Sequence, residues 1–235
     1  MSLAGVTSRR KADLLIKSGR VEVNGKKVRS VGTSVNENKD RIEIDGLRVK
    51  LEKDSVYLLL NKPKGFLTTI RDDFKRPTVL DLIHEIKERI FPVGRLDYDS
   101  EGVLLLTNDG DLAYRLTHPR FQIPRIYRVK VRGEVPERGI KDLKKGVKLE
   151  DGSLAKGEAI LLKKEKEKTT IKLKLTEGKK REVKRIFKAL GYEVEQLERL
   201  SFAGITTKGL KKGEWRHLLP KEVSNLRKML FLKGD

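Results

Sequence analysis

The chain has 235 residues, and its 54 Lys and Arg against 34 Asp and Glu give a formal net charge of +20 at pH 7. This basic excess favours a polyanionic partner, and nucleic acid fits better than a membrane because the sequence shows neither an amphipathic anchor nor an apolar run approaching about 18 residues. The sequence has no cysteine, which excludes disulfides and thiolate metal sites. Its N-terminus lacks the apolar segment of a secretory signal, so a cytoplasmic location is expected. The 3 histidines are scattered, and no metal ligand set is expected.

The first 46 residues form a small basic module in the sequence. Thr7 and Ser8 offer an N-cap for a helix that ends at Gly19. Residues 21–28 alternate in polarity around an Asn-Gly pair, which predicts a β-hairpin, and residues 41–46 predict another strand. The rest of the chain is long enough for one further domain of ordinary size.

The string AGVTSRRKADLLIKSGRVEVNG in this module resembles the RNA-binding domain that ribosomal protein S-four shares with tyrosyl-tRNA synthetases and RsuA-type pseudouridine synthases. The resemblance implies an RNA-binding domain over residues 1–50. That domain would be trimmed at its start, since its relatives usually begin with a few more helical residues. Its basic helix face would contact RNA phosphates, and the alternative is an ordinary solvated helix face. The candidate RNA-binding residues are Arg9, Arg10, Lys11, Lys17 and Arg20.

A polar connector over residues 47–55 is expected to lead into a second domain, residues 55–235. Residues 56–60 form a continuous apolar run that predicts a buried strand, and the NKPKG turn follows directly. YLLLNKPKG recurs in RsuA-type synthases, which implies that Lys62 contacts a phosphate near the site. The alternative is a turn that ends the strand and does nothing more. Apolar positions within residues 78–86 predict a short helix.

Residues 91–110, FPVGRLDYDSEGVLLLTNDG, join an apolar lead-in to a polar turn and then to a buried strand. The turn carries the carboxylates of Asp97, Asp99 and Glu101. As a bare DxDxEG pattern it would be an ordinary solvated turn. As a calcium loop it would need a glutamate where Asn108 stands, and its flanks would have to be helices.

The segment GRLDYDSEGVLLLTNDG resembles the signature of RsuA-type ribosomal RNA pseudouridine synthases over 17 nearly uninterrupted positions. The resemblance implies that Asp97 is the catalytic residue of such an enzyme. It also implies an α+β fold, in which a mixed and mainly antiparallel sheet is flanked by helices.

Polarity patterns predict the elements that follow this loop. They are a helix over 111–117, a strand over 125–131, a helix over 136–145, strands over 157–162 and 169–176, strands over 194–205 and 213–218, and a helix over 220–230. IYRVKVRG resembles the second motif of the family, which implies that Tyr127 stacks on the target base. A strand tyrosine is otherwise most often a core residue. Leu200 would help to wall the same base pocket.

Residues 176–192, TEGKKREVKRIFKALGY, predict a helix with one apolar face. Lys184 lies on the flank of that face, whereas Arg185 points nearly opposite to it. The segment resembles a third family motif, in which an arginine pairs with the catalytic Asp. Lys184 stands at that position and Glu182 replaces the usual Gln, so Lys184 is the candidate partner of the catalytic carboxylate, and Arg181 and Arg185 remain alternatives.

Enzymes of the resembling family cut uracil from its sugar, turn the base and rejoin it through carbon, with no cofactor. The resemblance implies that Asp97 attacks a flipped-out uridine at either the sugar or the base while Lys184 opposes its charge. Arg95 would fill the vacated position or hold a flanking phosphate; alternatively it pairs with Asp99 or Glu101. The candidate RNA contacts of the second domain are Lys62, Arg95, Arg181 and Lys188.

The implied partner is ribosomal RNA, with the large subunit favoured, or a ribosomal assembly intermediate. The enzyme is expected to act as a monomer without an obligate protein partner. A non-catalytic RNA-binding or assembly factor would explain the charge but not the three later motifs. A glycosidase-like hydrolase would use the clustered carboxylates, but a net charge of +20 argues against a neutral glycan.

Overall fold

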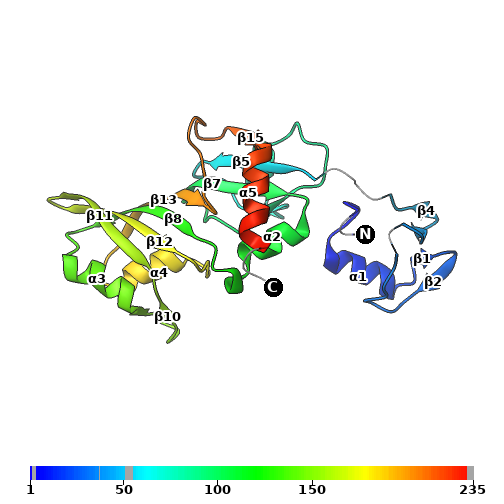
Figure 1. Ribbon diagram of the computed structural model, residues 1–235, viewed down its shortest axis with the longest axis horizontal. Helices are drawn as coiled ribbons and strands as arrows, with labels where there is room; N and C mark the ends of the chain where they lie inside the picture. The colour runs from blue at the N-terminus through cyan, green and yellow to red at the C-terminus, as the bar shows by residue number, and fades with distance from the viewer. Residues whose placement is uncertain (2–3, 37, 51–54, 232–235) are drawn as a thin grey trace. The chain divides into compact units, whose positions relative to one another are not determined.

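The structure, a computed structural model, describes residues 1, 4–36, 38–50 and 55–231. The chain forms two compact units, Met1–Val56 with Ile86–Ile90 and Tyr57–Glu85 with Phe91–Asp235 (Figure 1). Two sequence expectations fall partly outside the described residues. They are the trimmed start, which concerns residues 2 and 3, and the connector, which includes residues 51–54.

The first unit packs one helix with a small antiparallel sheet (Figure 1). Its elements are α1 (Arg9–Lys17), β1 (Val21–Val23), β2 (Lys26–Val28), β3 (Ile42–Ile44) and β4 (Leu47–Arg48), with the sheet order β2-β1-β3-β4. The Ser8 side chain accepts the Lys11 N–H at 3.2 Å, which confirms the predicted N-cap. Asn24 and Gly25 have φ values of +52° and +76°, so the predicted Asn-Gly hairpin is confirmed as well.

The second unit is built on one large mixed sheet. Its strands are β5 (Tyr57–Lys62), β6 (Phe91–Val93), β7 (Glu101–Thr107), β8 (Arg125–Arg132), β11 (Glu158–Glu165), β12 (Lys168–Leu175), β13 (Val194–Phe202), β14 (Ile205–Thr206) and β15 (Trp215–His217). The order along the sheet is β11-β12-β8-β13-β7-β5-β15, with β14 paired to β13 and β6 to β7. The short strands β9 (Val147–Lys148) and β10 (Leu154–Ala155) pair separately.

Strands β7 and β13 form the parallel seam of a sheet whose other described pairings are antiparallel. The seam pairs Glu198 with Glu101 and Arg199 with Gly102. A Cβ atom on Gly102 would lie 2.2 Å from the Arg199 carbonyl oxygen, and φ of Gly102 is +103°. Only glycine therefore allows the two backbones to approach this closely.

Helices pack on the large sheet of the second unit (Figure 1). They are α2 (Gly110–Thr117), α3 (Glu137–Lys145), α4 (Glu182–Ala189) and α5 (Pro220–Phe231), with 3-10 turns η1 (Val79–Leu82) and η2 (Pro119–Phe121). Helices α2 and α5 pack with strands β5, β6 and β7 in one apolar core that includes Leu59, Leu105, Leu116 and Leu226. Helix α3 contacts β11, and α4 contacts β13. The α+β class with a mixed, mainly antiparallel sheet is confirmed.

Three predicted segments differ from the observed ones, and in the first of them, the connector predicted over 47–55, Leu47–Arg48 form the strand β4 and pair with β3. The helix predicted over 78–86 is wrong, because only Val79–Leu82 turns and Ile83, which is buried, leaves helical backbone at ψ 53°. The strand predicted over 194–205 stops at Phe202, where Ala203 takes a φ of +52° and turns the chain back.

Within the described residues, no helix combines the length and the apolar character needed to cross a membrane. The same residues contain no group of three or more His, Cys, Asp or Glu side chains placed to hold a metal ion.

Candidate active site

The loop between β6 and β7, which carries Asp97, is held through its backbone. The Ser100 N–H donates to the Asp97 carbonyl oxygen at 3.0 Å and closes a tight turn. The Thr68 hydroxyl donates to the Leu96 carbonyl oxygen at 2.7 Å and accepts the Leu96 N–H at 3.3 Å. These bonds hold the backbone on either side of the Asp97 side chain, so the side chain is carried on a fixed loop.

Lys62 lies inside the protein and supports this loop. Its side chain is fully buried, and its ammonium donates to the carbonyl oxygens of Pro63, Asp97 and Ser100 at 3.0, 3.1 and 2.8 Å. The prediction that Lys62 contacts RNA is therefore wrong, because its three donors are used within the protein. Burial lowers the pKa of Lys62 to about 8, although the carboxylates of Asp99 and Asp97 oppose the shift. The ammonium thus keeps its proton at neutral pH.

Replacing Lys62 by Met is expected to lower the free energy of unfolding of the second unit by about 3 kcal/mol, because buried carbonyl oxygens lose their charged donor. Urea denaturation of the purified variant measures the loss. Lys64→Met is the matched control, since Lys64 is exposed in the same turn. Equal stability of the two variants would contradict the supporting role of Lys62.

The carboxylates of the loop share one ammonium from α4. The Nζ atom of Lys184 lies 2.6 and 2.5 Å from the two carboxylate oxygens of Asp99, and 3.9 Å from Oδ2 of Asp97. Partial burial raises the pKa of Asp99, but the hydrogen bond and charge of Lys184, with the charge of Arg181, outweigh burial and hold it below its ordinary value. Lys184 therefore binds Asp99 directly and reaches Asp97 at longer range.

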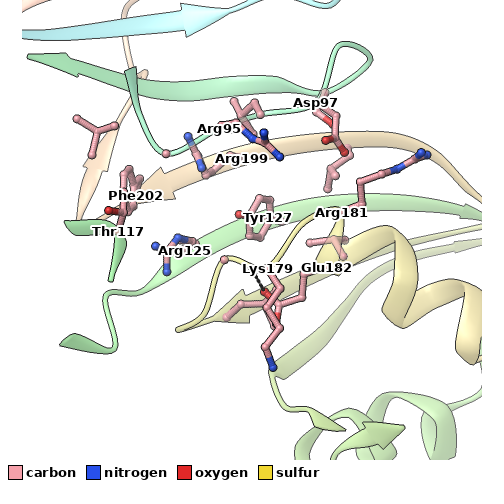
Figure 2. Close-up of a pocket in the computed structure, with 18 residues that line it drawn as sticks. Arg95, Asp97, Thr117, Arg125, Tyr127, Lys179, Arg181, Glu182, Arg199 and Phe202 are labelled. Atoms are coloured by element: carbon pink, nitrogen blue, oxygen red, sulfur yellow. Dashed lines mark hydrogen bonds between the residues drawn. The ribbon is translucent and has the colours of Figure 1, made fainter. Parts of the chain in front are cut away.

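One cavity joins the Asp97 loop to strand β8 (Figure 2). Its volume is about 100 Å³, which is room for roughly three water molecules or for one small ring. Asp97 lines it from the loop, and Tyr127, which is buried, lines it from β8. Figure 2 shows the Tyr127 ring between Asp97 and the segment that carries Lys179. The other charged residues that line the cavity are Arg95, Arg125, Lys179, Arg181, Glu182 and Arg199.

Two of these lining residues are buried arginines on neighbouring strands. Arg199 lies opposite Tyr127 in the register between β13 and β8. Arg125 donates to the carbonyl oxygens of Ile123 and Thr176 at 3.0 and 3.1 Å. Burial lowers the pKa of both arginines, while the nearby Tyr127 hydroxyl favours their charged forms.

Arg199 has a donor left over. Its Nε atom donates to the Val103 carbonyl oxygen at 2.7 Å, across the parallel seam. Its Nη2 atom is buried and has no hydrogen-bond partner among the described residues. An unpaired buried donor is costly, so a cavity lined by Arg199 is suited to a ligand that brings an acceptor oxygen.

Glu182, the residue that departs from the usual Gln, is buried in the same cavity. Its Oε2 atom accepts the Lys179 N–H at 3.1 Å (Figure 2). Burial raises the pKa of Glu182, and the Lys179 hydrogen bond opposes that shift. This bond ties the segment before α4 to the first residue of the helix.

The other sequence candidates occupy different surroundings. Arg95 and Arg181 line the cavity, whereas Lys188 is exposed and lies 3.6 Å from Glu150. Arg185 pairs with Asp151 at 2.6 Å and does not line the cavity. In the first unit the candidate RNA contacts are all exposed, and Arg20 also hydrogen bonds with Asp45; they are Arg9, Arg10, Lys11, Lys17 and Arg20. Their contacts with RNA remain predictions.

The prediction that Leu200 walls the base pocket is wrong. Leu197 lines the cavity from the same strand, and Leu200 is not among the lining residues. The pairing of β13 with β8 shifts register between Arg199 and Ser201, so a bulge at Leu200 takes it out of the ladder.

Sequence reasoning missed the buried arginines. Along β8, burial alternates, and Arg125 occupies the same inward face as Tyr127 and Val129. That spacing was visible in the sequence and could have flagged Arg125. Arg199 has the same spacing in β13, where it is buried on one face with Leu197 and Ser201, so the alternation could have flagged it as well.

Comparison with known proteins agrees with this geometry. The family described as RNA pseudouridylate synthase matches residues 56–189, and the S4 domain matches residues 2–42. The ribosomal large subunit pseudouridine synthase B of Bacillus subtilis is 46% identical over 95% of this chain and 92% of its own length. An uncharacterised RNA pseudouridine synthase of Aquifex aeolicus is 44% identical over 99% of this chain and 94% of its own.

A solved structure is similar over almost the whole chain. A crystal structure of a pseudouridylate synthase superposes with a TM-score of 0.68 at 27% identity and covers 95% of both chains. The sequence relatives, the family match over more than half of the chain and this structure lead to one conclusion. The chain belongs to the RNA pseudouridylate synthase family, as an RsuA-type pseudouridine synthase with an N-terminal S4 domain.

Proposed function

We propose that this RNA pseudouridine synthase isomerises a specific uridine of ribosomal RNA, with the large subunit favoured over the small one. The observation that carries the proposal is the cavity in which Asp97 and Tyr127 meet a buried Arg199 with an unpaired donor. The similarity to an enzyme named for the large ribosomal subunit supports the choice of RNA. Residues 1–50 would then bind RNA and residues 55–235 would catalyse the reaction.

Asp97 would act as the nucleophile on a uridine that is flipped out of the RNA. In the isomerisation the N1–C1′ bond breaks, a C5–C1′ bond forms, C5 loses a proton and N1 gains one, so no oxidant or cofactor is consumed. Asp97 would attack either the anomeric carbon or the uracil ring. Tyr127 would stack on the detached uracil and hold it while it turns.

The charges around the cavity fit these roles. Lys184 lies close enough to Asp97 and Asp99 to oppose the negative charges of both carboxylates. The guanidinium of Arg199 carries donors only, so its free Nη2 would pair with a carbonyl oxygen of uracil. Cytosine presents an amino group in place of one of these oxygens and would fit less well.

The surface charge suits an RNA partner outside the cavity. The exposed arginines and lysines of the first unit, with Arg95, Arg181 and Lys188 of the second, would contact RNA phosphates. RNA affinity is then expected to fall steeply as salt rises, because bound phosphates release counterions. We infer a monomer that works in the cytoplasm on ribosomal RNA or on a ribosomal assembly intermediate.

Comparing pseudouridine maps of ribosomal RNA from cells with and without this protein tests the proposal. One pseudouridine of the large-subunit RNA is expected to disappear and to return when the wild-type chain is restored. A loss confined to small-subunit RNA would contradict the preferred substrate. An unchanged map would contradict ribosomal RNA as the substrate.

The two other classes considered from sequence lose their support. A non-catalytic RNA-binding factor would not explain why residues 56–189 match the RNA pseudouridylate synthase family. A glycosidase would have no use for an S4 domain.

A further inference from the structure

An exposed aromatic pair lies on loops attached to the Asp97 loop. Phe74 is 81% exposed, more than any other large apolar side chain in the described part of the chain, and Tyr98, next to Asp97, is 52% exposed. Single exposed apolar residues are common on protein surfaces. Two exposed aromatic rings, one of them adjacent in sequence to the candidate nucleophile Asp97, are a different case, provided that their loops are held in place.

The turn that presents Phe74 is ordered by one carboxylate. The Oδ2 atom of Asp72 accepts the backbone N–H groups of Phe74 and Arg76, both at 3.0 Å, and the guanidinium of Arg76 binds Asp72 at 2.7 Å. These hydrogen bonds hold the pKa of Asp72 near 2, so the carboxylate stays ionised at neutral pH. Phe74 is therefore held out into solvent by a fixed backbone.

A cation packs against one of the two rings. The guanidinium carbon of Arg76 lies 5.3 Å from the centroid of the Phe74 ring. Asp72 raises the pKa of Arg76, and the Tyr98 hydroxyl is close enough to add to this effect. The Tyr98 backbone is fixed as well, because its carbonyl oxygen accepts the Gly65 N–H at 2.8 Å. Phe74, Arg76 and Tyr98 together form what we call the rim cluster.

We propose that the rim cluster binds the nucleotides that flank the target uridine, with Phe74 and Tyr98 stacking on their bases and Arg76 facing their phosphates. Aromatic rings interleaved with cations are the usual platform for unpaired nucleic acid, since every base has a face that can stack. The inference rests on the proposed RNA substrate and adds a requirement for the structure of the RNA around the target uridine. The preferred substrate is a uridine whose neighbours are unpaired, in a loop or a bulge, and not a uridine within a continuous duplex.

The test measures binding and stacking in the full chain with Asp97→Asn, which prevents turnover. The probe is an RNA stem-loop that contains the mapped uridine, with 2-aminopurine replacing the base on either side of it. Binding by the Asp97→Asn protein is expected to quench the 2-aminopurine fluorescence. Adding Phe74→Ala or Tyr98→Ala is expected to weaken binding about tenfold each and to remove the quenching at one flanking position.

Three comparisons make the result specific. Phe74→Trp and Tyr98→Phe keep a ring and are expected to restore both affinity and quenching. Ile160→Ala removes another exposed apolar side chain, from strand β11, and is expected to change neither. Placing the same uridine in a continuous duplex is expected to abolish the difference between the parent and the alanine variants.

Unchanged affinity and unchanged quenching in both alanine variants would overturn the inference, and a rim cluster that serves another protein would give this result. A separate assay, tritium release, tests the proposed function itself. If the wild-type chain releases no tritium from uracil-labelled ribosomal RNA, the substrate is wrong. If the wild-type chain is active but the alanine variants of the rim cluster change neither affinity nor quenching, the inference is rejected and the proposed function stands.

Discussion

Replacing Asp97 by Asn is expected to abolish pseudouridine formation while RNA binding stays nearly intact. The amide has almost the shape of the carboxylate, so the backbone hydrogen bonds that hold the loop are kept. It lacks the negative charge of a nucleophile, and removing the nucleophile of an enzyme costs more than about 10⁴-fold in kcat. Tritium release from uracil-labelled RNA measures the rate, and a filter-binding titration measures the affinity.

Asp99→Asn is the matched control for this experiment. Asp99 belongs to the same loop and binds Lys184 more closely than Asp97 does, yet it does not line the cavity. A much smaller loss of rate is therefore expected. Product from a clean Asp97→Asn preparation, or equal losses in both variants, would remove Asp97 from the catalytic role.

Lys184→Met is expected to lower kcat about 10²- to 10³-fold with the fold retained. Without the ammonium, the negative charges of Asp97 and Asp99 face each other across a partly buried loop with no cation from Lys184 to balance them. Rates measured at saturating RNA, with circular dichroism to check the fold, test both expectations.

Two further variants separate the position of the charge from its presence. Lys188→Met removes an exposed lysine from the same helix and is expected to keep the wild-type rate at saturating RNA. Lys184→Arg keeps the charge and is expected to recover much of the activity. Wild-type turnover in Lys184→Met would point to Arg181 instead, since Asp151 already binds Arg185.

The elements that form the site could be read from local patterns. The apolar run after Asp97 predicted a buried strand because it lacks polar positions, and β7 is buried almost throughout. The apolar spacing in α4 placed Lys184 on the flank that turns toward the loop, and its ammonium lies there. Both inferences depend on residues that are close in sequence, and the spacing of apolar residues predicts their arrangement well.

The failures depend on contacts between distant residues. Lys62 looks like a surface lysine in a turn, because an unpaired charge is rarely buried. Two of its three acceptors lie 35 and 38 residues further along the chain, so no local pattern reveals them. Leu200 failed for a related reason, since the bulge that displaces it exists only in the pairing of β13 with β8.

The parallel seam between β7 and β13 separates Asp97 from Tyr127. Asp97 precedes β7 on one side of it, and Tyr127 lies in β8 on the other. A slight rocking of one half of the sheet against the other would draw the carboxylate away from the ring while every helix and strand stayed intact. The alignment of Asp97 with Tyr127 thus depends on a short backbone junction. On heating, the enzyme is expected to lose activity at a lower temperature than the one at which it unfolds.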